Sequence, residues 1–143
     1  MPMSSELLTF DAGTDERKDS SMAKASPLHP DTVKDFGVAI DRATDVDGYT
    51  VNFVTITQTH DLAPMLAGLP TGNCPCPHWG VVQKGRVIVR YADHEEVLQA
   101  GDAFYMAPGH APEAEEGTEL IQFSPADQLA EVEAAIMAAM QSG

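Results

Sequence analysis

The chain has 143 residues and a formal net charge of −14, from 22 acidic and 8 basic residues. This length suits one domain with its own core and is too short for two ordinary domains. The negative charge argues against nucleic acid and anionic membrane surfaces as partners, because no cluster of lysine and arginine interrupts it.

The N-terminal region, residues 1–30, is polar and rich in serine, which predicts a loosely ordered arm. Its apolar stretch Leu7–Phe10 could dock on the body or add an edge strand in a dimer. The region lacks the basic and then apolar pattern of a signal peptide, and no segment of the chain approaches the ~20 apolar residues needed to cross a bilayer. We therefore expect a cytoplasmic protein.

Short segments rich in β-branched and aromatic residues predict strands through residues 31–125, with a broken loop over residues 60–72. Turn residues separate these segments at regular intervals, which is typical of an antiparallel sandwich or barrel and predicts an all-β fold. The predicted strands are Phe36–Ile40, Tyr49–Ile56, Val81–Gln83, Arg86–Tyr91, Glu96–Gln99, Ala103–Met106 and Glu119–Phe123, and the first two are separated by a turn at Asp45–Gly48.

The last segment, residues 126–143, predicts a helix. Ser124 can cap it and Pro125 suits its first turn. Four apolar residues recur at helical spacing and give one stripe, which we expect to pack on the barrel rather than to form a dimer contact. They are Leu129, Val132, Ile136 and Met140.

A run of potential metal ligands, Cys74-Pro75-Cys76-Pro77-His78, precedes the predicted strand at Val81. The two cysteines are too close in sequence for a disulfide that would link distant parts of the chain. In an extended strand the three ligating side chains would leave the same face, which predicts a ligand row, with Trp79 on the other side as a core or interface anchor. The prolines favour an alternative, since a polyproline II segment would spread the three side chains around the chain. For His78 by itself, a structural hydrogen bond is the alternative to metal ligation.

Two further segments resemble the cupin superfamily of small β-barrels. Gly85 matches the glycine that closes the first cupin motif, and Gly101–His110, with its Gly-Asp and Pro-Gly turns, resembles the second. The resemblance covers Val51–Pro125 and implies a single jelly-roll-like barrel.

The usual cupin ligands do not fall on the matching positions of this chain. The position of the family's glutamate holds His78, the paired histidines fall on Gly72 and Cys74, and the histidine of the second motif falls on Pro112. The resemblance therefore implies either a metal-free barrel or a ligand set rebuilt from Cys74, Cys76, His78 and His110.

Thiolate and imidazole ligands favour Zn²⁺, and iron or copper would also accept them. Three protein ligands would leave a position open for water or substrate, whereas four would make a structural site.

The resemblance implies a protein that binds a small organic molecule, with Tyr49, Phe53 and Tyr105 as candidates to line its cavity. An oxygenase, isomerase or hydrolase would fit a metal site, but the sequence assigns no catalytic residue. The alternatives are a non-catalytic module that responds to metal or oxidant, and a metal-free barrel that acts through dimerisation. Cupins are often dimers, so we expect a homodimer.

Overall fold

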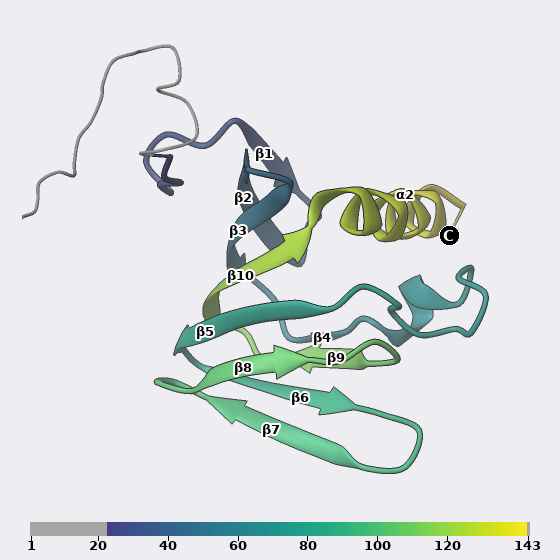
Figure 1. Cartoon of the computed structure of the whole chain (residues 1–143). Helices are drawn as coiled ribbons and strands as arrows, with labels where there is room; N and C mark the ends of the chain where they lie inside the picture. The colour runs from purple at the N-terminus through teal and green to yellow at the C-terminus, as the bar shows by residue number, and fades with distance from the viewer. Residues whose placement is uncertain (1–22, 143) are drawn as a thin grey trace, which may run out of the picture.

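The computed structural model describes residues 23–142, so the predicted contacts of Leu7–Phe10 lie outside the described residues. Two antiparallel sheets face each other, and the C-terminal helix lies beside one end of them (Figure 1). The six-stranded sheet has the order β1 (Thr32–Asp35), β2 (Ala39–Val46), β3 (Tyr49–Ile56), β10 (Glu119–Pro125), β5 (His78–Lys84), β8 (Ala103–Met106). The four-stranded sheet has the order β4 (His60–Asp61), β9 (Ala111–Ala114), β6 (Arg86–Arg90), β7 (Glu95–Gln99). The predicted antiparallel β-fold with a C-terminal helix is confirmed.

The β2–β3 hairpin is longer than the sequence pattern predicts. Asp47 and Gly48 have φ values of 50° and 84°, the positive pair that a two-residue type I′ turn requires. The turn is therefore confined to these two residues, and Asp45 is still within β2, where its carboxylate accepts a hydrogen bond from Thr50 Oγ1 at 2.7 Å.

Gly85, the glycine that resembles the end of the first cupin motif, allows β5 to turn sharply into β6. Its φ is +85°, and a Cβ there would lie 2.5 Å from Cα of Thr118. The Thr118 hydroxyl accepts a hydrogen bond from the Arg86 amide at 3.0 Å and donates to the Arg86 carbonyl at 3.1 Å. Only glycine combines this backbone conformation with so close a neighbour.

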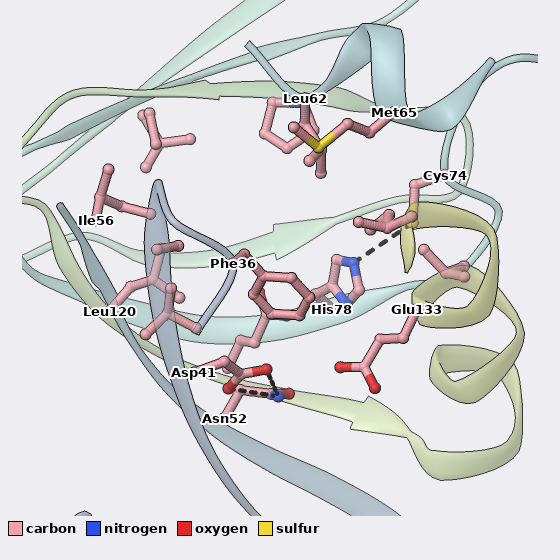
Figure 2. Close-up of a pocket in the computed structure, with 18 of the residues that line it drawn as sticks. Phe36, Asp41, Asn52, Ile56, Leu62, Met65, Cys74, His78, Leu120 and Glu133 are labelled. Atoms are coloured by element: carbon pink, nitrogen blue, oxygen red, sulfur yellow. Dashed lines mark hydrogen bonds between the residues drawn. The ribbon is translucent and has the colours of Figure 1, made fainter. Parts of the chain in front are cut away.

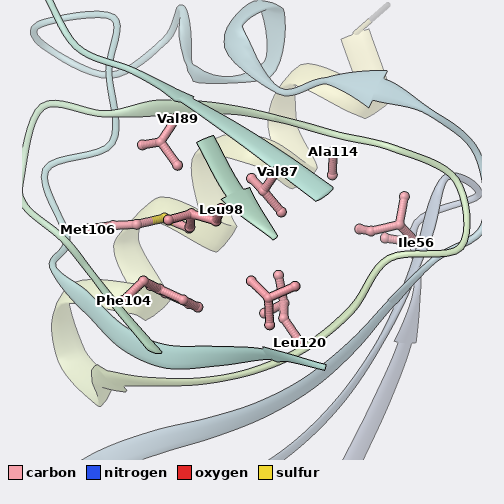
Figure 3. Packing of buried hydrophobic residues seen from close by; sticks show 10 residues of the cluster. Ile56, Val87, Val89, Leu98, Phe104, Met106, Ala114 and Leu120 are labelled. Carbon is pink, nitrogen blue, oxygen red and sulfur yellow. The ribbon is translucent and has the colours of Figure 1, made fainter. Parts of the chain in front are cut away.

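The main core fills the space between the two sheets (Figure 3). Its side chains come from both sheets at alternate strand positions, as the period of two along a strand requires. The buried members are Ala39, Ile56, Val82, Val87, Val89, Leu98, Phe104, Met106, Ala114 and Leu120.

A second apolar cluster joins α2 (Ala126–Ser142) to the 3₁₀ helix η3 (Ala63–Leu66) and to the cysteine segment. Leu129 and Val132 are buried in it, Ile136 packs against it, and Met140 at the end of the predicted stripe is 37% exposed. The helix therefore covers the end of the barrel through the first three residues of its stripe.

Ser124 does not act as the predicted cap of this helix. It belongs to β10, and its hydroxyl lies 2.6 Å from Nδ1 of His78 in the adjacent strand β5. The extended backbone of β10 continues to Pro125 because Pro125 still pairs with Tyr49 of β3.

The outer face of the six-stranded sheet carries aromatic residues. Trp79 is 42% exposed and lies between Tyr105, at a ring-centroid distance of 5.1 Å, and Tyr49, at 6.4 Å. Trp79 thus faces away from His78, as the strand alternation predicts. The expected homodimer stays a prediction. Among the helices in the described part of the chain, none has the length and apolar character of a membrane span.

Candidate functional site

A cavity of about 180 Å³ lies between the sheets, next to α2 and η3. Its walls are mainly apolar side chains from β2, β3, β10 and the helix. Polar side chains interrupt this lining mainly in two groups, one around His78 and one around Asp41 (Figure 2). His60 and Gln122 also line the cavity.

The first polar group consists of Cys74, His78 and His110, which we call the Cys/His cluster. One ligand atom from each residue lies within 4.8 Å of the others, and all three residues are buried. The backbone brings them together, because the Cys74 amide donates to the His110 carbonyl at 2.9 Å and the Gly109 amide donates to the Cys74 carbonyl at 2.8 Å. His78 then enters from the first position of β5.

Hydrogen bonds hold both imidazole rings from behind. Nδ1 of His78 lies 2.6 Å from Oγ of Ser124, and Nδ1 of His110 lies 2.6 Å from the carbonyl oxygen of Ala107. Nδ1 of His110 therefore donates its proton to that carbonyl, which leaves Nε2 as the available ligand atom. Such partners behind a metal-ligating histidine fix the orientation of the ring.

Burial keeps these groups uncharged in the absence of an ion. Burial lowers the pKa of His78 to about 3, with a smaller contribution from the neighbouring His110, and it also lowers the pKa of His110. Neutral imidazole is the form that binds a metal. Burial raises the pKa of the Cys74 thiol, which therefore keeps its proton in the absence of an ion. The thiol would lose this proton when a metal binds.

The spacing of one donor pair, Cys74 and His78, fits a tetrahedral ion. With the usual bond lengths of zinc to sulfur and nitrogen, two such donors on a tetrahedral ion lie about 3.6 Å apart. Sγ of Cys74 and Nε2 of His78 lie 3.6 Å apart. The donor types and their separation therefore both suit zinc or a similar transition metal.

Cys76 is buried but lies outside the Cys/His cluster. Its Sγ lies 3.5 Å from the carbonyl oxygen of Pro77, and burial raises the pKa of its thiol to about 12. The chain bends at Cys76 and β5 begins only at His78, so the alternation expected for an extended strand does not hold across the two prolines. Cys74 and His78 still meet, with Sγ of Cys74 3.6 Å from Nε2 of His78.

The aromatic residues expected to line the cavity lie elsewhere. Tyr49 and Tyr105 are exposed on the outer face, and Phe53 is half-buried and is not among the lining residues. Each lies one position away from an inward-facing residue of its strand, such as Asn52 beside Phe53. Prediction from residue type alone cannot tell the two faces apart.

The second polar group was missed by the sequence analysis. Asp41 of β2 and Asn52 of β3 line the cavity, and Nδ2 of Asn52 donates to the two carboxylate oxygens of Asp41 at 3.0 and 2.9 Å. Glu133 of α2 also lines the cavity, and its carboxylate accepts a hydrogen bond from Nζ of Lys34 at 2.8 Å. A usable signal was present, since Asn52 alternates along β3 with Val54 and Ile56, which line the cavity.

Comparisons with known proteins find similarity at the level of structure. No protein-family model and no curated protein matches the sequence. An iron(II) form of HppE matches with a TM-score of 0.53 at 13% identity, covering 79% of this chain and 64% of that chain. A Rhizobium leguminosarum protein of unknown function matches with a TM-score of 0.53 at 15% identity, covering 72% of this chain and 94% of that chain.

A cupin is also among the matching structures. An RmlC-like cupin from Shewanella frigidimarina matches with a TM-score of 0.46 at 18% identity, covering 66% of this chain and 83% of that chain. At such identities the similarity concerns the fold alone. This chain shares its fold with HppE and the Rhizobium leguminosarum protein, which agrees with the antiparallel β-fold that the sequence predicted. Its cavity contains side chains that could hold a metal ion.

Proposed function

We propose that this cupin-fold protein binds a divalent transition metal through Cys74, His78 and His110, and a small organic molecule in the cavity beside them. The convergence of the three buried ligand atoms within 4.8 Å carries this proposal. Cys74 and His78 come from one segment and His110 from another, and the two histidines have their second ring nitrogen already occupied.

Zinc is the metal that we favour, because one thiolate and two imidazoles match its ligand preference. Iron and copper are the alternatives, since both accept the same donors. With three protein ligands, a bound ion of this kind supplies a coordination position at which a water molecule or a substrate oxygen is polarised. The role of the protein side chains is to hold the two imidazoles neutral and oriented, and to surround the site with apolar walls that exclude bulk water.

This arrangement supports a metal-dependent enzyme over the redox-responsive module. A thiol reacts with oxidants as the thiolate, and burial raises the pKa of both Cys74 and Cys76. The identity of the reaction is left to experiment, because fold similarity does not transfer chemistry.

Metal analysis of the purified protein tests the proposal. Wild-type protein, purified without added metal and also reconstituted with zinc, iron or copper, should hold about one ion per chain by elemental analysis. Cys74→Ser and His78→Asn should lose that ion. Cys76→Ser is the matched control, since its thiol is buried in the same segment but faces the Pro77 carbonyl.

Three outcomes are informative. Loss of metal in Cys74→Ser with retention in Cys76→Ser supports the three-ligand site. Equal loss in both variants contradicts it in favour of a four-ligand site that includes Cys76. The absence of stoichiometric metal from wild type, both as purified and after reconstitution, contradicts metal binding altogether. If metal binds, turnover of a panel of small compounds that stops when the metal is removed supports the enzyme, and metal binding without turnover contradicts it.

A further inference from the structure

An oxygen atom in the cavity wall has no hydrogen-bond partner. In the described part of the chain, Oδ1 of Asn52 is the buried side-chain atom for which no partner is found, and Asn52 itself is 1% exposed. The amide nitrogen of Asn52 donates to the carboxylate of Asp41, so the unpartnered atom is the carbonyl oxygen, which is an acceptor. A buried acceptor without a partner costs on the order of 1–3 kcal/mol, which a ligand with a donor group would recover.

The charge around this acceptor selects the kind of donor. Asp41 is 7% exposed and Glu133 contributes a second carboxylate to the same cavity. Lys34 pairs with Glu133 from outside, so that it neutralises one of the two negative charges. Among the lining residues that the structure describes, none is lysine or arginine. Lys34 lies opposite Asp41 in the β1–β2 pairing, but its ammonium group bonds to Glu133, so the two carboxylates share one cation. A cationic donor is favoured over a neutral donor, and an anion is disfavoured.

The size of the cavity limits the ligand. The cavity measures about 180 Å³. An apolar cavity of about 150 Å³ accommodates benzene in another protein, so this one suits a molecule of roughly six to nine non-hydrogen atoms. Apolar side chains such as Val54, Ile56 and Leu120 line the same space and would contact the body of such a molecule.

We propose that the ligand of this cavity is a small primary amine whose ammonium group binds between Oδ1 of Asn52 and the carboxylate of Asp41. The apolar part of the amine packs against the aliphatic wall. This inference rests on the proposed function in so far as the cavity binds a small molecule, and it is independent of whether a metal is present.

Three probes of similar size test the inference: benzylamine, benzyl alcohol and benzoate. They share one ring and differ in a headgroup that is cationic, neutral or anionic at pH 7. Binding to metal-free and to metal-loaded wild-type protein is measured by calorimetry. Benzylamine should bind about ten- to a hundredfold more tightly than benzyl alcohol, as expected for a charge-assisted hydrogen bond in place of a neutral one. Benzoate should bind most weakly to the metal-free protein.

Variants identify the residues responsible. Asp41→Asn keeps the size of the side chain and should bring benzylamine to within about threefold of benzyl alcohol. Asp45→Asn is the matched control, because it removes one negative charge from an exposed position of the same strand outside the cavity, and it should retain the preference. Thermal unfolding of both variants checks that the fold is kept.

The failure of this inference differs from the failure of the proposed function. Equal binding of benzylamine and benzyl alcohol, or a preference that persists in Asp41→Asn, overturns amine recognition and leaves the small-molecule cavity in place. If no probe binds to protein that contains stoichiometric metal, amine recognition is overturned and the metal site stands. If amine preference is found in a protein that never holds metal, the inference is supported and the metal part of the proposed function fails.

Discussion

Nδ1 of His78 lies 2.6 Å from Oγ of Ser124, and this contact ties the first residue of β5 to the end of β10 directly before the C-terminal helix. The hydroxyl orients the imidazole from the side opposite Nε2, which faces the sulfur of Cys74. This hydrogen bond therefore adds to the backbone pairing of β10 with β5 in positioning the candidate metal ligand.

Ser124→Ala should weaken metal binding without abolishing it. The substitution removes the hydrogen bond behind His78 and leaves all three ligands in place, so we expect a loss of about ten- to a hundredfold in metal affinity. Competition with a chelator of known affinity measures this change. An affinity equal to that of wild type would show that the hydroxyl does not support the ring in the way we infer, and the unfolding of the metal-free variant serves as the control for folding.

Asp41→Asn should change how stability depends on pH. Burial raises the pKa of the Asp41 carboxyl, against the opposing effect of its hydrogen bond from Asn52. The folded state therefore holds the Asp41 proton more tightly than the unfolded state. This contribution to stability is fully present below the ordinary carboxyl pKa of 3.8 and is lost as the pH rises through the raised value.

The unfolding free energy of Asp41→Asn minus that of wild type should therefore be more positive at pH 7 than at pH 3.5. Denaturant unfolding of both proteins at the two pH values, in the absence of ligand, measures the difference. A variant whose relative stability falls with rising pH would mean that the charged carboxylate is favoured in the folded state, contrary to our account.

Gly85→Ala should destabilise the fold more than other glycine substitutions at positive φ. An added Cβ would meet the backbone of Thr118, which cannot move without disturbing the β5–β6 turn, and overpacking of this kind costs about 1–3 kcal/mol in addition to the backbone strain. Gly101→Ala is the control, because Gly101 has a φ of +95° but nothing within 4 Å of the added atom. Equal free energies of unfolding for the two variants would contradict the role of the Thr118 contact.

Leu129→Ala tests the packing of the helix on the barrel. Leu129 is buried in the cluster that joins α2 to η3, so its truncation should cost about 2–5 kcal/mol of unfolding free energy. Met140→Ala, near the exposed end of the same stripe, should cost less than about 1 kcal/mol. A large loss in Met140→Ala that depends on protein concentration would instead indicate that the helix end contacts a second copy.

The sequence alone predicted the antiparallel β-fold and most of its strands, because these depend on local features. It missed β1, β4 and β9, and it placed a strand over Phe36–Ile40, where β2 begins only at Ala39. The alternation of β-branched residues with turn residues is visible without any knowledge of the tertiary contacts. So are turn glycines such as Gly85 and Gly109, both of which have positive φ in the structure. Cys74, His78 and His110 were recognised as candidate ligands from their chemistry.

The tertiary structure decided which polar side chains share a cavity. The bend at Cys76 separates it from its neighbours, and a residue-by-residue alternation rule cannot foresee such a bend. Asp41 and Asn52 meet only because β2 and β3 pair in one particular register, while Glu133 reaches the same cavity from the helix. These contacts join residues distant in sequence, and they are set by how the sheets and the helix pack together rather than by any local pattern.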